Sequence, residues 1–356
     1  MRVAFLTGPS PAGRCGVGDY TGCLVAALRA RGAEASVVSS VKWNLASALQ
    51  IHSYLREHAY DLVHIQYPTA GFGTKLGPQG LALLERCVIT LHEASSVHIL
   101  RKLALLPFTI RPKHLIFTSH FERDFVVRWM PRVSRFSSVI PIGSNVGVAA
   151  GEGPRNLGEI VHFGLIMPKK GLENVIKLGE IIKSKELSFR IRILGSTPPK
   201  HGEYFKDLKA RTATLPIIWD HDLSEQQIAS KLAASSIAYL PYPDGVSERR
   251  ATFSAAVLNG VAVITTRGPQ TPSQLEGLVK FCESPEEALA AATFLASNPE
   301  PRAKLVSEAR RYAQQFTWER IADLHGALYQ RLLSLHSERD PTSVRAAEDE
   351  EHFVQK

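Results

Sequence analysis

The sequence contains no feature of a secreted or membrane-spanning protein. Its 356 residues include only four cysteines, which form no C-x-x-C pair, so no disulfide framework is indicated. No apolar run approaches the roughly 18 residues that a membrane-spanning helix needs. Met1 and Arg2 lead directly into an expected strand, whereas a signal peptide has a longer apolar run and a cleavage site of small residues. We therefore expect a cytoplasmic protein.

The sequence also lacks the short motifs of several enzyme classes. A G-x-S-x-G nucleophile elbow, an H-E-x-x-H zinc helix and a G-x-x-x-x-G-K-[ST] phosphate loop are all absent. The thirteen histidines form no cluster with metal-ligand spacing. We therefore expect no metal ligands and no resident cofactor.

A glycine loop at residues 13–19 invites a dinucleotide interpretation but does not fit it. Its spacing is not G-x-G-x-x-G, and the second expected strand ends in Ser39 and Ser40 with no acidic residue to bind a ribose. A nicotinamide-dependent enzyme is therefore disfavoured. The loop either brings a ligand close to the backbone of Gly16 and Gly18 or is a tight turn between a strand and a helix.

Charge is distributed unevenly along the chain. The formal net charge is +8, and residues 1–150 hold sixteen Lys and Arg against eight Asp and Glu, so the remainder is neutral. Residues 98–113 mix cations with bulky apolar side chains. That mixture suits docking on anionic lipid or on a polyanionic acceptor, but a core helix with cations reaching solvent has the same composition. Peripheral contact with the anionic inner face of the cell membrane is one expectation, and nucleic acid is not an expected partner.

Strand and helix patterns alternate along almost the whole chain, and its length suggests two domains. The expected strands cover residues 3–7, 35–39, 61–67, 87–91, 115–119 and 138–142, then 159–164, 189–195, 237–240 and 261–265. This alternation predicts an α/β fold of two Rossmann-like, doubly wound parallel sheets, with helices on both faces and ligands at the carboxyl ends of the strands.

The domain boundaries follow from composition. Residues 146–154 combine small side chains with glycines and form the best linker candidate. We therefore expect a first domain at 1–150 and a second at 151–316. A long helix at about 317–336 follows, and residues 337–356, with six acids, are expected to be disordered.

The most informative stretch runs from residue 237 to residue 266. Residues 237–240 read as a buried strand, residues 244–245 as a turn, and residues 252–258 as a helix with Ser247 as its N-cap. A helix N-terminus has unpaired N–H groups and a partial positive charge. With two arginines in the preceding loop, a phosphate group could bind there. The alternative is an ordinary turn with two solvated arginines.

A histidine stands at the end of an expected strand in the first domain. His92 and Glu93 follow residues 87–91, at the edge of an open α/β sheet where ligands bind. An imidazole can donate to a sugar hydroxyl or move a proton. The alternative is a structural histidine, which is the usual role of a lone one.

Six motifs occur in a recognisable order: Gly16–Thr21, Asp61–Tyr67, Thr90–Glu93, Val139–Gly143, Phe163–Leu172 and Phe316–Glu319. In this order and spacing they resemble the two-domain GT-B glycosyltransferases, specifically the large retaining family known as family 4. The resemblance covers nearly the whole chain up to about residue 336. It implies a nucleotide-sugar donor whose diphosphate is held by the second domain, an acceptor bound mostly on the first, and a last helix that crosses back to the first domain.

The sequence departs from that family at the donor site. The resemblance implies a lysine and an arginine for the diphosphate; the lysine falls at Lys170, but the arginine position holds Leu165. The two glutamates of the family, one for the transferred sugar and one for the ribose, fall at Ser247 and Ala255. Neither residue is acidic.

We interpret these departures as a replacement within one loop. Arg249 or Arg250 would take the place of the missing arginine, and Thr252 would bond a phosphate oxygen. The predicted catalytic residues are His92, Lys170 and Arg250. The predicted donor-binding residues are Gly16, Gly18, Gly164, Gly195, Asp244, Gly245, Ser247, Arg249 and Thr252, and the predicted acceptor-side residues are Asp19, Tyr20 and Glu93.

The resulting hypothesis is a retaining, hexosyltransferase-like enzyme of cell-surface polysaccharide or glycolipid synthesis. It would move a sugar from a nucleoside diphosphate to a hydroxyl acceptor that a lipid could carry. One alternative is a non-catalytic GT-B relative that scaffolds an assembly complex, which the missing glutamates favour. Another is a GT-B sugar-nucleotide epimerase or hydrolase.

Overall fold

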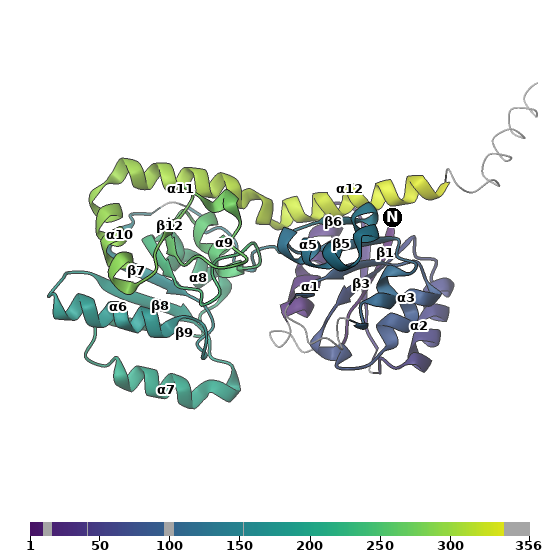
Figure 1. The fold of residues 1–356 in the computed structure, drawn as a ribbon, viewed down its shortest axis with the longest axis horizontal. Coiled ribbons are helices and arrows are strands. Elements are labelled where there is room, and N and C mark those ends of the chain that lie inside the picture. The colour runs from purple at the N-terminus through teal and green to yellow at the C-terminus, as the bar shows by residue number, and fades with distance from the viewer. Residues whose placement is uncertain (10–15, 41, 96–102, 152, 338–356) are drawn as a thin grey trace, which may run out of the picture. The chain divides into compact units, whose positions relative to one another are not determined.

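The computed structural model describes residues 1–9, 16–40, 42–95, 103–151 and 153–337. It divides the chain into two compact units (Figure 1). The first unit comprises Met1–Pro141 with Trp318–Lys356, and the second comprises Ile142–Thr317.

The first unit contains a six-stranded parallel sheet in the order β2-β1-β3-β4-β5-β6. Most of its strands are short, buried apolar runs, as expected for a parallel sheet covered on both faces. All six expected strands are present, with ends that differ from the expected ones by at most three residues. The strands are β1 (Arg2–Leu6), β2 (Glu34–Val38), β3 (Leu62–Tyr67), β4 (Val88–Leu91), β5 (His114–Phe117) and β6 (Ser137–Val139).

Side-chain caps fix where several helices of this unit begin. Asn44 accepts a hydrogen bond from the amide of Ser47 at 2.9 Å, and Ser119 accepts one from the amide of Glu122 at 3.3 Å. The helices are α1 (Gly16–Arg29), α2 (Leu45–Glu57), α3 (Gly77–Leu84), α5 (His120–Trp129) and α12 (Trp318–Ser337), with 3₁₀ turns η1 (Ala70–Phe72), η2 (Leu106–Thr109) and η3 (Pro131–Phe136).

The second unit contains its own six-stranded parallel sheet in the order β12-β11-β10-β7-β8-β9. Its strands are β7 (Asn156–Phe163), β8 (Arg190–Gly195), β9 (Ile217–His221), β10 (Ser235–Leu240), β11 (Ala262–Thr265) and β12 (Lys280–Phe281). Its helices are α6 (Leu172–Ser184), α7 (Gly202–Arg211), α8 (Glu225–Ala233), α9 (Ala251–Leu258), α10 (Pro285–Ser297) and α11 (Pro299–Ala313), with 3₁₀ turns η4 (Pro199–His201), η5 (Ser273–Leu275) and η6 (Gln314–Phe316). The predicted pair of doubly wound sheets is therefore confirmed.

The last helix belongs to the first unit, where α12 packs against α1. The rings of Tyr20 and Trp318 lie 5.3 Å apart between their centres, and Arg31 forms an ion pair with Asp323. The long helix expected at the end of the chain is confirmed. The disorder expected beyond it concerns residues that lie outside the described part, apart from Ser337, which is the last residue of α12.

The segment singled out as a linker begins inside the second unit. Val146 is buried in a core cluster of that unit. The Asn259 side chain accepts a hydrogen bond from the amide of Ala149 at 2.9 Å and donates one to the carbonyl of Gly147 at 3.0 Å. The division of the chain accordingly falls after Pro141 rather than near residue 150. Small residues here predicted a linker between the domains, but the side chain of Asn259 holds residues 147–149 against the second unit.

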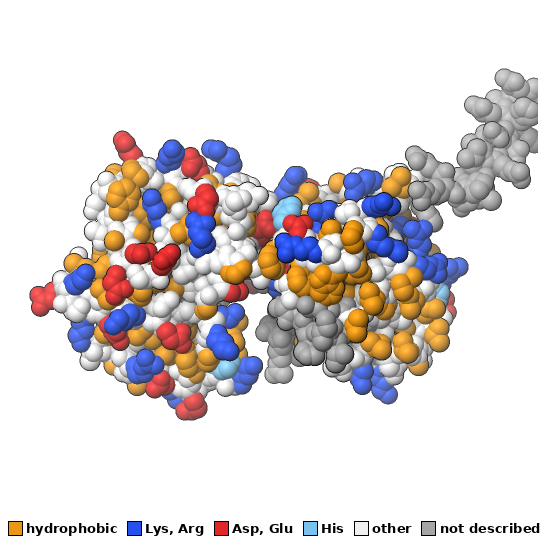
Figure 2. Space-filling model, viewed as in Figure 1, with side chains coloured by type: hydrophobic (Ala, Val, Ile, Leu, Met, Phe, Trp, Pro, Cys, Tyr) orange, Lys and Arg blue, Asp and Glu red, His pale blue; other side chains and the backbone are white. Residues whose placement is uncertain are grey.

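The basic segment expected at residues 98–113 is described from Leu103 onward, and residues 98–102 lie outside the description. The described part is not one continuous helix, because η2 interrupts it. Phe108 is buried, whereas Leu106 and Ile110 are exposed. On the face shown in Figure 2, Lys and Arg are spread widely over the first unit. No described helix is long and apolar enough to cross a membrane.

Two buried histidines are held as neutral groups. His162 Nδ1 donates to the carbonyl of Tyr239 at 2.9 Å, and His325 Nδ1 donates to the carbonyl of Ile321 at 2.8 Å. Within the described structure, the Nε2 atom of each ring has no hydrogen-bond partner. Burial lowers the pKa of each histidine to about 4.

These histidines predict a loss of stability in mild acid. The unfolded chain takes up each proton near pH 6.5 and the folded chain only near pH 4, so stability falls as the pH drops through that window. Each group should remove on the order of 2 kcal/mol of unfolding free energy between pH 8 and pH 5. Urea unfolding at these pH values measures the loss. His325→Phe should reduce the dependence of the unfolding free energy on pH, whereas His58→Phe, at an exposed histidine, is the control and should not. The same pH dependence in the wild type and both variants would contradict the role of His325.

Candidate functional site

Two loops of the second unit meet at the carboxyl edge of its sheet. One runs from β7 to α6 (residues 164–171) and the other from β10 to α9 (residues 241–250), and these two strands are neighbours. The loops touch at Gly171, which has a φ of +81°. A Cβ atom there would lie 1.8 Å from the carbonyl oxygen of Pro241. Glycine is therefore required at this contact, which places the preceding Lys170 beside the second loop.

Arg250 is oriented by its neighbours in the second loop. Its guanidinium forms an ion pair with Asp244 and lies over the ring of Tyr242, 4.8 Å from the ring centre. The hydroxyls of Tyr242 and Thr252 are hydrogen-bonded at 2.7 Å. The Arg250 side chain is still 22% exposed, and its Nε has no hydrogen-bond partner among the described residues. Neighbouring side chains thus hold the guanidinium in place and leave part of its donor capacity unused.

Lys170 and Arg250 are close enough to influence each other. Burial lowers the pKa of the Lys170 ammonium, the positive charge of Arg250 lowers it further, and Asp244 acts in the opposite direction. Two cations and one carboxylate therefore share this region, which leaves it with a positive charge. An anion bound beside both cations would relieve their repulsion.

Both cations also stand at the start of a helix. Lys170 precedes the N-cap of α6, and Arg250 is itself the N-cap of α9. At neither helix does an N-cap side chain bond the first-turn amides of the described structure. The amides and the partial positive charge of a helix N-terminus add to the attraction for an anion.

The turn in the second loop rests on a third segment that sequence reasoning missed. Gly245 has a φ of +85°, and a Cβ atom on it would lie 2.2 Å from the amide nitrogen of Gly268. A Cβ atom on Gly268 would in turn lie 1.9 Å from the carbonyl oxygen of Asp244. Tyr242 was missed as well, although an aromatic residue between two prolines was a visible signal. The backbone contact with Gly268 left no signal in a single sequence.

Ser247 is not the N-cap that the sequence predicted. Helix α9 begins at Ala251, because residues 247–250 form a turn in which the amide of Arg250 donates to the carbonyl of Ser247 at 3.1 Å. Ser247 is buried. At the other position of the missing glutamates, Ala255 is fully buried in the core, and Leu165, at the position of the missing arginine, is 46% exposed.

The remaining residues predicted to bind the donor differ in what they contact. Gly195 ends β8, and a Cβ atom on it would lie 2.1 Å from the carbonyl oxygen of Gly164, so close packing alone accounts for that glycine. Thr252 and Arg249 are half-buried near Arg250.

In the first unit, a buried hydrogen-bond network orients His92. The ring follows β4, and its Nε2 donates to Gln66 Oε1 at 2.7 Å, since that oxygen can only accept. Gln66 Nε2 lies 3.5 Å from His64 Nε2, which also bonds the Thr90 hydroxyl at 2.7 Å. The Tyr20 ring meets His92 edge-on with 5.0 Å between the ring centres. The network fixes both the tautomer and the direction of His92.

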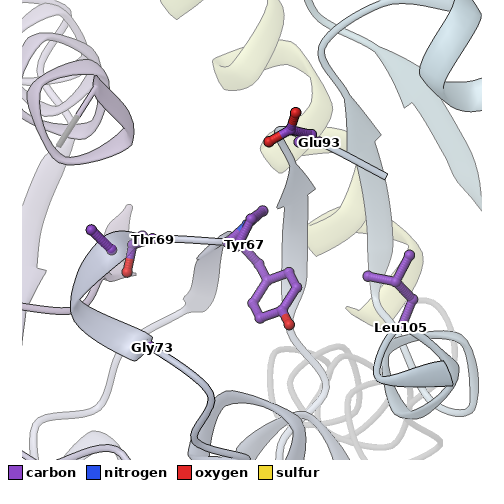
Figure 3. A pocket seen from close by; sticks show the side chains of 7 residues that line it. Tyr67, Thr69, Gly73, Glu93 and Leu105 are labelled. Atoms are coloured by element: carbon purple, nitrogen blue, oxygen red, sulfur yellow. The ribbon is translucent and has the colours of Figure 1, made fainter. Parts of the chain in front are cut away.

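A hollow of about 230 Å³ lies beside Glu93, within the first unit. Figure 3 shows Tyr67, Thr69, Gly73, Glu93 and Leu105 around it. The wall combines a carboxylate and hydroxyls with apolar surface, which suits a small ligand that carries hydroxyl groups. The sequence pointed to Glu93 but not to the other lining residues, which come from separate segments.

The last predicted residues lie in the first turn of α1. Gly16 is exposed, Gly18 and Asp19 are half-buried, and Tyr20 is buried, which raises the pKa of its phenol. Tyr20 therefore supports His92 by packing. The rest of the predicted glycine loop, residues 13–15, lies outside the description.

The predicted site residues thus fall into two groups. The structure brings Lys170, Asp244, Arg250 and Thr252 together in the second unit. It brings Tyr20 and His92 together in the first, with Glu93 next in sequence. No group of three or more His, Cys, Asp or Glu that could hold a metal occurs in the described part of the chain.

No protein-family model matches the chain, and no curated protein matches it significantly. Several solved structures share its fold. A glycosyltransferase from Rickettsia africae has a TM-score of 0.72 at 15% identity, with 93% of this chain and 98% of that chain covered. HepE from Anabaena, in complex with UDP and glucose, has a TM-score of 0.68 at 13% identity, with 93% and 100% covered.

A third similar structure is the sucrose-phosphate synthase from Thermosynechococcus elongatus, with a TM-score of 0.67 at 16% identity and 94% and 100% of the two chains covered. Identities this low establish a shared fold. The chain accordingly has the GT-B fold that the sequence predicted.

The contact at Gly171 gives a direct test of the loop geometry. Gly171→Ala should destabilise the protein by about 2 kcal/mol or more, because the new methyl group meets the Pro241 carbonyl and the φ angle is unfavourable. Gly202→Ala is the matched control, since its φ is −59° and no atom lies within 4 Å of the added Cβ. Urea unfolding should show a change within about 1 kcal/mol for the control. Equal effects of the two substitutions would rule out the close contact.

Proposed function

We propose that the protein is a retaining glycosyltransferase that moves a sugar from a nucleoside diphosphate to a hydroxyl acceptor. The observation that carries this proposal is the pairing of Lys170 with Arg250 at the starts of α6 and α9. A cationic pair beside two helix N-termini suits a diphosphate group. The GT-B fold, shared with a protein whose structure contains UDP and glucose, supports the same function.

The two cations would act on the charge that develops in the reaction. When the bond between the sugar and the diphosphate breaks, negative charge accumulates on the leaving phosphate oxygen. Lys170 and Arg250 would stabilise that charge, an effect commonly of several kcal/mol. Arg250 would exchange its ion pair with Asp244 for the phosphate. The Thr252 hydroxyl, now bonded to Tyr242, would donate to a phosphate oxygen.

Retention of configuration needs attack on the face from which the diphosphate leaves. In this proposal, the departing phosphate oxygen accepts the proton of the acceptor hydroxyl as the new glycosidic bond forms. The protein supplies no covalent nucleophile in this route, so positioning and electrostatic stabilisation provide the rate enhancement. The ordered resemblance to family 4 motifs supports this stereochemistry.

The acceptor would bind on the first unit. Glu93 and Thr69 in the hollow beside β4 would orient acceptor hydroxyls, with His92 fixed by Gln66. The excess of positive charge in residues 1–150 suits an acceptor that is acidic or presented on anionic lipid. We therefore place the reaction in cell-surface polysaccharide or glycolipid synthesis on the cytoplasmic side of the membrane.

Nucleotide binding tests the donor assignment. UDP, GDP, ADP and dTDP would each be titrated against the protein while its thermal midpoint is followed. One of them should raise the midpoint, because a ligand at a 100-fold excess over its Kd adds about 2.7 kcal/mol of stability. Lys170→Ala and Arg250→Ala should each weaken the binding of that nucleotide at least about tenfold, since each substitution removes a charge-assisted hydrogen bond.

Lys304→Ala, an exposed cation on α11, is the matched control and should bind like the wild type. If the wild type and both site variants bound the nucleotide equally well, the diphosphate assignment would be wrong. A protein that binds none of the four nucleotides would instead be the non-catalytic scaffold. Release of nucleotide from a donor sugar without any acceptor would indicate a hydrolase or epimerase.

A further inference from the structure

One flank of the first unit exposes a continuous set of apolar side chains. The elements α2, α3 and η2 lie side by side. These elements and Ile110, the residue after η2, carry six large apolar side chains. Each is at least 40% exposed: Leu45 and Leu49 on α2, Leu83 and Leu84 on α3, Leu106 on η2, and Ile110. We refer to these six residues as the leucine face. Hydrophobic side chains are seen gathered over this region in Figure 2.

The leucine face differs from ordinary scattered exposure. The described part of the second unit exposes fewer large apolar residues: Leu187 and Phe294 line one hollow, and Leu165 lies in the loop after β7. Single exposed apolar residues are normal on soluble proteins, whereas a contiguous group marks a binding surface.

Cations border the leucine face at one end. Arg56, Arg86, Arg111 and Lys113 line a hollow of about 810 Å³ that Leu84 also lines. Arg111 additionally donates to the backbone carbonyl of Leu83 at 3.4 Å, so one of these cations lies against the end of α3. Burial lowers the pKa of the Lys113 ammonium, and Arg86 lowers it further, which is the electrostatic setting that an anion would relieve.

Two carboxylates, Asp61 and Glu85, line the same hollow, and both raise the pKa of the Lys113 ammonium, against the effect of burial and Arg86. Asp61 accepts a hydrogen bond from the backbone amide of Arg2 at 2.6 Å. Glu85 lies 3.5 Å from the imidazole of His52. The four cations therefore outnumber the two acids, and the hollow keeps a positive excess.

We propose that this flank docks on an anionic membrane. The leucine face would enter the boundary between lipid headgroups and acyl chains, and the four cations would bind lipid phosphates. Apolar residues beside clustered Lys and Arg are the combination that interfacial membrane binding requires. Two copies of the chain joined symmetrically through this face would bring the same cations toward each other, and like charges oppose such a dimer.

Docking would also serve the proposed reaction. Leu106 of the leucine face follows Leu105, which lines the hollow beside Glu93. A lipid-carried acceptor could therefore reach that hollow from the membrane surface. This link rests on the proposed transferase function, whereas the docking itself does not.

Sedimentation with vesicles tests the docking. Binding would be compared on vesicles of phosphatidylcholine alone and on vesicles that also contain phosphatidylglycerol. Each cation near an anionic surface strengthens binding about fivefold, so the protein should bind the anionic vesicles at least about tenfold more tightly. High salt should weaken this binding.

Substitutions separate the two contributions. Leu83→Glu combined with Leu106→Glu should reduce binding to anionic vesicles at least about tenfold, because apolar insertion is lost. Leu187→Glu is the matched control, since Leu187 and Leu83 are both 40% exposed. Arg111→Glu should weaken binding about fivefold or more, whereas the control Lys304→Glu should not.

Three outcomes would overturn the proposal. They are equal binding to both vesicle types, full binding by the Leu83→Glu/Leu106→Glu variant, and a wild-type dimer that this variant dissociates. The nucleotide titration keeps the two proposals separate. Variants of the leucine face should show the same rise of the thermal midpoint with nucleotide as the wild type. Conversely, a wild type whose midpoint does not rise with any nucleotide can still bind vesicles.

Discussion

The candidate donor site depends on one backbone contact. Gly171 lies against the carbonyl of Pro241, and no residue with a side chain fits there. This contact connects the loop that carries Lys170 to the loop that carries Arg250, although these two cations lie 80 positions apart in the sequence. A second contact of the same kind, between Gly245 and Gly268, supports the turn that holds Asp244. The two cations are thus positioned by main-chain packing, which is far stiffer than long side chains would be.

Each unit contains a polar side chain whose orientation is fixed by its neighbours, but the kinds of contact differ. In the second unit, Arg250 is oriented by an aromatic ring and an ion pair. In the first, His92 is oriented by an amide that belongs to a fully buried polar network. Such a network is stable only when its members satisfy one another, so it favours one arrangement of the ring. Side chains that their neighbours hold in place need less ordering when a ligand binds.

The sequence was sufficient for the architecture because its signal is periodic. Buried strands such as Leu62–Tyr67 can be recognised in a single sequence, and so can Gly260, the glycine that follows α9. The order of the motifs indicated the fold. Helix starts were harder: the turn at residues 247–250 displaced the start of α9, and polar residues before a helix do not reveal which of them caps it.

The parts of the site that the sequence did not reveal are contacts between distant segments. Gly268 and Gln66 act through neighbours that are remote in the chain. Composition carries no record of such contacts. The same reason explains the segment 146–149, where glycine and alanine suggested a linker but Asn259 anchors the backbone.

Asp244 gives the second unit a property that the list of its cations alone would not suggest. Because this carboxylate pairs with Arg250, an anion that takes its place at the guanidinium has to offset the loss of an internal ion pair. A weakly charged ligand merely exchanges one single charge for another, whereas a diphosphate offers more charge and can engage Lys170 at the same time. In the proposed site, Asp244 would therefore favour ligands that reach both cations over neutral sugars, which offer Arg250 no charge in exchange for the ion pair.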